Sequence, residues 1–126
     1  MLRVNLPEAE ERLVVFGYLC LAAANAEEYG ARRTELESYA AKHDLRVGRI
    51  FVDEGYGDAV LSRPGFAQLC LLLRLEQPSG VLLLQPEDLS SREASALMLA
   101  RRIWAAGVDI YTVHGEAPFT EPQSTS

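Results

Sequence analysis

A group of carboxylates follows two short apolar segments of this chain, and these side chains have the clearest capacity for chemistry. They are Asp53, Glu54 and Asp58 after one segment, and Glu87 and Asp88 after the next. The carboxyl ends of parallel strands meet at one edge of a sheet, where gathered oxygen ligands could coordinate Mg²⁺. The simpler interpretation, which we favour, is solvated loop carboxylates. We therefore keep Asp53, Glu54, Glu87 and Asp88 only as weak metal candidates and predict no cofactor.

The cysteines and histidines offer little further chemistry. Cys20 lies near the end of the apolar run Leu13 to Leu21, where an open α/β sheet presents its ligands. A reactive thiol there is one alternative, but a cysteine in an apolar run is usually inert. His43 and His114 show no metal-ligand spacing with each other or with the cysteines, so we predict no zinc site.

The elements that would position these residues alternate between strand-like and helical patterns. We expect strands over Leu13 to Leu21, Val47 to Val52, Val81 to Leu84 and Val108 to Val113. We expect helices over Ala26 to His43, from Arg63-Pro64 onward, and from Ser90 to Gly107. Ser90 with Glu93 has the spacing of a capping box. Strand–helix–strand repeats with right-handed crossovers predict a three-layer α/β/α sandwich around a mainly parallel sheet of four or five strands.

Length and composition indicate one globular domain. The chain has 126 residues, of which 48% are hydrophobic, enough to bury a core. We expect one α/β domain over residues 12–115 and no ordered structure over residues 116–126, which are rich in Pro, Ser and Thr. The longest apolar run is too short to span a bilayer, and the first residues lack the basic start of a signal peptide. We therefore expect a cytoplasmic protein with no membrane partner.

The net charge of −6 argues against autonomous DNA binding. DNA affinity comes largely from neutralising phosphates with Lys and Arg, and an acidic domain repels DNA at long range. We therefore expect no nucleic-acid binding by this chain alone.

Three segments carry a further signal in their order and spacing. They are Tyr18-Leu19-Cys20-Leu21-Ala22, Arg63-Pro64-Gly65-Phe66 and Glu87-Asp88-Leu89-Ser90-Ser91. Together they resemble the catalytic domain of the resolvase/invertase family of serine recombinases. Asp53-Glu54-Gly55 is similar to a segment that the family has after its second strand, and a glutamine common on its first helix falls at Arg32. The resemblance covers roughly Leu13 to Gly115 and implies a resolvase-like fold.

The chain departs from the family where the chemistry is done. The family's first segment is Tyr-x-Arg-x-Ser, whose serine attacks a DNA phosphodiester, but Cys20 and Ala22 hold the arginine and serine positions. The third segment is Asp-Arg-Leu-x-Arg, and here Asp88 and Ser91 replace its two arginines. Tyr18 and Arg63 are retained. Phosphoryl transfer needs a nucleophile and cationic groups together, so we predict that this chain is not an enzyme.

Two expected helices are apolar on two sides, which favours an interaction surface. We predict that it is drawn from Leu71, Leu72, Leu75, Leu97, Met98 and Trp104. Scattered exposed leucines are the simpler alternative.

The function hypothesis is therefore a catalytically inactive recombinase-like domain that acts as a protein–protein interaction or regulatory module, through a protein partner or self-association. One alternative is an enzyme with repurposed chemistry at the acidic strand ends. Another is an accessory subunit that modulates an active recombinase. The family's catalytic domain is followed by a long helix and a DNA-binding region, whereas this chain ends at residue 126, which strengthens the expectation of no autonomous DNA binding.

Overall fold

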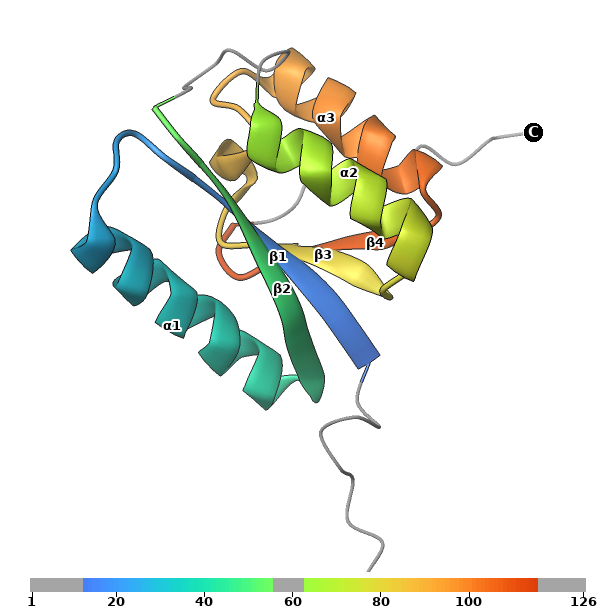
Figure 1. Ribbon diagram of the computed structural model, residues 1–126, viewed down its shortest axis with the longest axis horizontal. Coiled ribbons are helices and arrows are strands. Elements are labelled where there is room, and N and C mark those ends of the chain that lie inside the picture. The colour runs from blue at the N-terminus through green and yellow to red at the C-terminus, as the bar shows by residue number, and fades with distance from the viewer. Residues whose placement is uncertain (1–12, 56–62, 116–126) are drawn as a thin grey trace, which may run out of the picture.

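The computed structural model describes residues 13–55 and 63–115, where strands and helices alternate along the chain (Figure 1). The strands are β1 (Leu13–Leu21), β2 (Leu45–Glu54), β3 (Gly80–Leu83) and β4 (Asp109–Thr112). The helices are α1 (Ala26–Lys42), α2 (Pro64–Glu76), α3 (Glu93–Ala105) and the short 3-10 helix η3 (Pro86–Asp88). Residue 12, Asp58 and the expected tail 116–126 lie outside the described residues. None of the helices described is long and apolar enough to cross a membrane.

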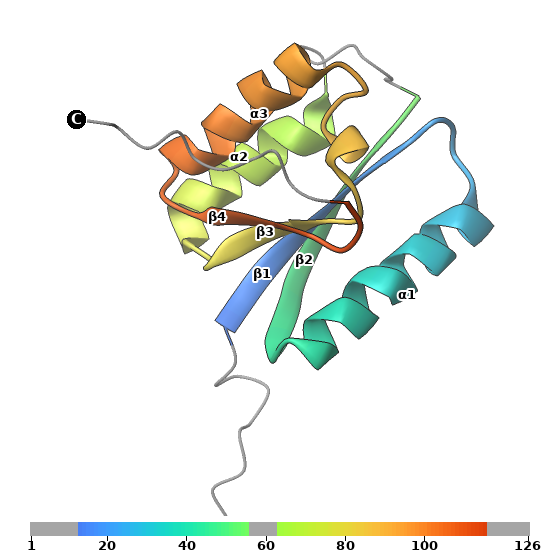
Figure 2. The same ribbon diagram turned by 180° about the vertical axis from the view of Figure 1, so that it is seen from behind.

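The described strands form one parallel sheet in the order β2-β1-β3-β4. Helix α1 covers one face of the sheet, and α2 and α3 lie side by side on the other face (Figures 1 and 2). This arrangement confirms the predicted three-layer α/β/α sandwich, with four strands in the described part of the chain. It also explains the continuous apolar run of β1, which is a central strand covered on both faces.

The core is divided between the two faces by the alternation of side chains along β1. Val15 and Leu19 point to one face and pack with Leu36 of α1. Phe16 and Tyr18 point to the other face and belong to the larger cluster formed with α2 and α3. Because successive side chains of a strand alternate between its faces, this one strand anchors both layers of helices.

The predicted capping box of the third helix is wrong. Helix α3 begins at Glu93 with Arg92 as its N-cap residue, and no side chain caps it. Ser90 is buried, and its Oγ accepts a hydrogen bond from the Arg92 backbone N–H, 3.0 Å away. Serine makes such local turns as readily as helix caps, so the spacing of Ser90 and Glu93 did not decide between them.

Strand β2 is longer than predicted because polar residues interrupt its apolar pattern without ending it. The pairing with β1 skips Gly48, since Val15 faces Val47 and Phe16 faces Arg49. Gly48 is thus the extra residue of a β-bulge. Arg49, on this edge strand of the described sheet, is exposed to solvent.

The expectation that Trp104 lies on an exposed strip is also wrong. Trp104 is only 9% exposed and belongs to the core cluster on the α2 and α3 face. A helix packed against both a sheet and a neighbouring helix buries more than one of its sides, so two apolar sides do not by themselves require a partner. Leu72 and Leu97 are half-buried against the same cluster, whereas Leu71, Leu75 and Met98 are exposed.

Candidate functional site

A network of polar side chains lies near the carboxyl ends of β1, β2 and β3, where open α/β sheets place their ligands. Tyr18 comes from β1, Asp53 from β2, Arg63 from the residue before α2, and Asp88 from η3. All four are buried. Charged groups in such a position must be satisfied by the protein or they would destabilise it, so the partners of each one decide what the site can do.

Asp53 joins β2 to the first turn of α2. Its carboxylate accepts hydrogen bonds from the Tyr18 hydroxyl at 2.6 Å, the Gly65 N–H at 2.7 Å and the Phe66 N–H at 2.9 Å. It therefore caps a helix N-terminus from a neighbouring strand, where a negative charge is favourable. Gly65 is required for this approach, because a Cβ there would lie 2.6 Å from the Val52 carbonyl oxygen.

Tyr18 is held as a neutral hydrogen-bond donor. Burial raises the pKa of its hydroxyl, and the hydrogen bond to Asp53 raises it further. Its ring also meets the Phe66 ring edge to face, with 5.5 Å between centroids. Tyr18 thus serves to hold Asp53 and the start of α2 in place.

Asp88 organises the loop that follows β3. One carboxylate oxygen accepts from the Leu84 and Gln85 N–H groups, both at 3.2 Å, and the other accepts from the Cys20 N–H at 3.5 Å. The Arg32 guanidinium lies 3.6 Å away on the side of α1. Asp88 is 1% exposed, and this burial raises the pKa of its carboxyl to about 6, against the hydrogen bonds and Arg32, which lower it.

Arg63 links Tyr18 to the backbone of η3. Its guanidinium donates to the backbone carbonyl of Asp88 at 3.0 Å and to the Tyr18 hydroxyl oxygen at 3.5 Å. Arg63 is therefore engaged with the protein itself, and its hydrogen bonds tie the start of α2 to η3.

The other positions that the resemblance singled out are Ala22, Ser91 and Cys20. Ala22 lies one residue beyond β1 and is exposed, and Ser91 is exposed shortly before α3. Cys20 is half-buried, and burial is the main cause that raises the pKa of its thiol. A raised thiol pKa disfavours the thiolate, which is the nucleophilic form.

The weak metal candidates do not form a ligand set. Asp53 and Asp88 direct their carboxylates at backbone N–H groups, whereas Glu54 and Glu87 are exposed. Over residues 13–55 and 63–115, no group of three or more His, Cys, Asp or Glu side chains could hold a metal ion. Asp58 lies outside these ranges.

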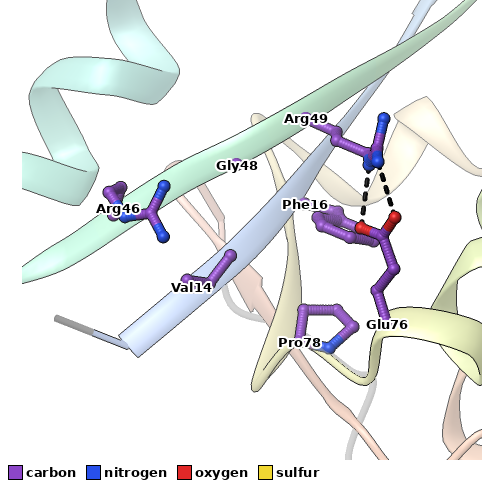
Figure 3. A pocket seen from close by; sticks show the side chains of 7 residues that line it. All are labelled: Val14, Phe16, Arg46, Gly48, Arg49, Glu76 and Pro78. Atoms are coloured by element: carbon purple, nitrogen blue, oxygen red, sulfur yellow. Dashed lines mark hydrogen bonds and ion pairs between the residues drawn. The ribbon is translucent and has the colours of Figure 1, made fainter. Parts of the chain in front are cut away.

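A separate hollow lies at the opposite, amino-terminal end of the strands, between β1, β2 and the end of α2 (Figure 3). Its lining residues are Val14, Phe16, Arg46, Gly48, Arg49, Glu76 and Pro78. Arg49 crosses it to pair with Glu76, with 2.9 Å between Nε and Oε1. This ion pair neutralises the arginine that would otherwise attract an anion, and it secures the end of α2 to the edge strand.

Sequence reasoning missed Arg32 and Gly65 as parts of the network. Gly65 lies in a segment singled out only for its resemblance, and the need for glycine there depends on a contact with β2. The resemblance implies a glutamine at position 32 and an arginine at position 88, whereas this chain has Arg32 and Asp88. Opposite charges at these two positions were the signal for the ion pair that the structure shows.

Comparisons with known proteins support the fold. No protein-family model matches this chain, and no curated protein does. Among solved structures, the C-terminal catalytic domain of ISC1926 TnpA, an IS607-like serine recombinase, matches with a TM-score of 0.71 and 20% identity, over 84% of this chain and 71% of its own. The N-terminal catalytic domain of TP901-1 integrase matches with a TM-score of 0.71 and 21% identity, over 79% and 77%. The product of the first open reading frame in transposon ISC1904 from Sulfolobus solfataricus P2 matches with a TM-score of 0.64 and 17% identity, over 86% and 72%. The chain therefore has the fold of serine recombinase catalytic domains, as its sequence predicted.

Proposed function

We propose that this chain is a recombinase-like domain that does not cleave DNA and acts as a protein–protein interaction or regulatory module. The observation that carries the proposal is the buried carboxylate of Asp88, which stands where the resemblance places an arginine. A negatively charged carboxylate at this position repels a phosphate, whereas an arginine would attract it. At a separation of 4 Å and an effective dielectric constant of about 20, two like charges repel by about 4 kcal/mol.

The other positions support the same conclusion. Ala22 carries a methyl group at the position of the attacking serine, so no side-chain oxygen is available for covalent transfer. Arg63 already donates to the Asp88 carbonyl. Losing one preorganised charge-stabilising group commonly lowers a rate by about 10²–10³, and here several positions differ together.

The alternative of a repurposed acidic or thiol site receives no specific support from the geometry. The carboxylates of Asp53 and Asp88 are turned toward backbone donors, and burial disfavours the Cys20 thiolate. Buried acids that accept several backbone hydrogen bonds serve the fold. We therefore retain the interaction module as the single proposed function.

Relaxation of supercoiled DNA tests the absence of cleavage. We expect no relaxation by the wild-type chain or by Ala22→Ser, since the restored serine would still face Asp88 and lack the neighbouring arginines. A catalytically active serine recombinase serves as the positive control. Relaxation by the wild-type chain would overturn the proposal, and relaxation by Ala22→Ser alone would show that the phosphate-binding groups are intact.

The interaction half of the proposal needs its own measurement. Light scattering across a concentration series reports whether the chain self-associates, and the same experiment with a purified active recombinase reports whether the two pair. A chain that stays monomeric, pairs with no recombinase and binds none of the helical peptides described below would contradict an interaction role.

A further inference from the structure

A groove runs between α2 and α3 on the outer surface of the domain, away from the polar network at the strand ends. The two helices lie side by side in both views (Figures 1 and 2). The groove is lined by Ala67, Cys70, Leu71, Arg74, Arg102 and Ala105. Its lining therefore combines small side chains, one large exposed apolar side chain and two arginines.

The apolar surface continues along both helices beside the groove. Leu71 is 56% exposed and Leu75 is 68% exposed, one turn apart on α2. Met98 is 41% exposed and lies one turn before Arg102 on α3. Residues four apart share a helix face, so Leu75 extends the exposed apolar surface of Leu71 along α2, and Met98 lies next to Arg102 on the surface of α3.

The two arginines bring concentrated positive charge to this surface. Arg102 is held with its guanidinium 5.3 Å from the centre of the Phe66 ring. Arg74 and Arg102 both line the groove. Their charges lower the pKa of the Cys70 thiol, against the burial that raises it. Within residues 13–55 and 63–115, no salt bridge joins either arginine to a carboxylate. This local positive charge stands out in a chain of net charge −6.

We propose that the α2–α3 groove binds an amphipathic helix of a partner protein, with apolar side chains against Leu71 and Met98 and acidic side chains against Arg74 and Arg102. This assignment rests on the proposed interaction function and specifies the chemistry of its partner. Small side chains in the groove allow a helix to approach closely, because interaxial distance depends on side-chain size at the contact. Apolar anchors repeated over successive turns are the usual mode of helix-in-groove recognition.

The charges also favour this occupant over others. A second copy docked about a two-fold axis through the groove would bring the arginines of the two copies together, which like-charge repulsion disfavours. Duplex DNA would pair with the arginines but would leave Leu71 and Leu75 against a charged backbone. An acidic amphipathic helix satisfies both kinds of surface.

The test is a selection on the full chain with a display library of amphipathic helices of about 16 residues, roughly four turns. The leucine stripe is fixed, and the flanking positions vary among Glu, Lys, Gln and Ser. We expect enrichment of Glu beside the stripe. The enriched peptide should bind Arg74→Glu and Arg102→Glu about tenfold or more weakly, and replacing its Glu residues with Lys should restore binding to both variants.

Arg101→Glu is the matched control, since it makes the same charge change on α3 at an exposed position outside the groove lining. It should leave the affinity within about twofold. Absence of Glu enrichment, or equal weakening by Arg101→Glu and Arg102→Glu, would overturn the assignment. So would a dimer that Leu71→Asp dissociates, or DNA binding that Arg74→Glu abolishes. The DNA-relaxation assay is independent of these outcomes, so failure of the groove assignment can be told apart from failure of the proposed absence of cleavage.

Discussion

Replacing Asp53 with alanine should destabilise the domain by about 2.5–7 kcal/mol, because three donors lose one acceptor group. The Tyr18 hydroxyl and the Phe66 N–H are buried, and each unsatisfied buried donor costs about 1–3 kcal/mol. The Gly65 N–H is partly buried and loses less, about 0.5–1 kcal/mol. Small domains have total stabilities of about 5–15 kcal/mol, so Asp53→Ala should approach the limit of folding.

Urea unfolding at neutral pH, followed by circular dichroism, measures this loss directly. Two milder variants grade the effect. Asp53→Asn keeps one carbonyl oxygen and should lose about 1–2 kcal/mol, and Tyr18→Phe removes a single hydrogen bond and should lose about 1 kcal/mol. A loss below about 1 kcal/mol for Asp53→Ala would refute the interpretation of this carboxylate as a structural cap, and a reactive role for it would then need to be reconsidered.

Further predictions concern the neighbouring positions. The pKa of Asp88, raised to about 6, exceeds its ordinary value by about two pH units. The free energy of unfolding should therefore increase by up to about 3 kcal/mol as the pH falls through 6 toward 4, and decrease by the same amount as the pH rises again. Urea titrations at several pH values should show this slope in the wild type and a flatter one in Asp88→Asn. Trp104→Ala should cost about 3–5 kcal/mol in unfolding free energy, as expected for a core residue, whereas Leu75→Asp should change it by less than about 0.5 kcal/mol. Arg63→Met should lower the melting temperature and raise hydrogen exchange at the Leu84 and Gln85 N–H groups, because the guanidinium no longer secures η3.

The sequence was sufficient for the architecture because its periodicities are strong. The continuous apolar run of β1 and the alternation of short apolar and longer helical segments led to the parallel three-layer sandwich without any structural information. The predicted ends of helices and strands were less accurate where one residue type fits two different local structures. Ser90 could cap a helix or close a turn, and Arg46 could precede a strand or lie within it.

The site was only partly predictable, for a different reason. The sequence placed Asp53 and Asp88 correctly at the carboxyl ends of the strands, but it could not show what their oxygens contact. Their partners are backbone N–H groups, which every sequence possesses and no motif reveals. Burial of Trp104 likewise depends on the packing of two helices on one sheet face, which helical periodicity alone does not specify.

We propose that the polar network at the strand ends maintains the fold and does not break phosphodiester bonds. The most direct test is the intact mass of the wild-type chain after incubation with supercoiled and with nicked DNA, followed by nuclease digestion. We predict the unmodified mass in every sample, with an active serine recombinase giving the nucleotide-bearing mass under the same conditions. A mass increase equal to one or more nucleotides on this chain, retained after denaturation, would contradict the claim.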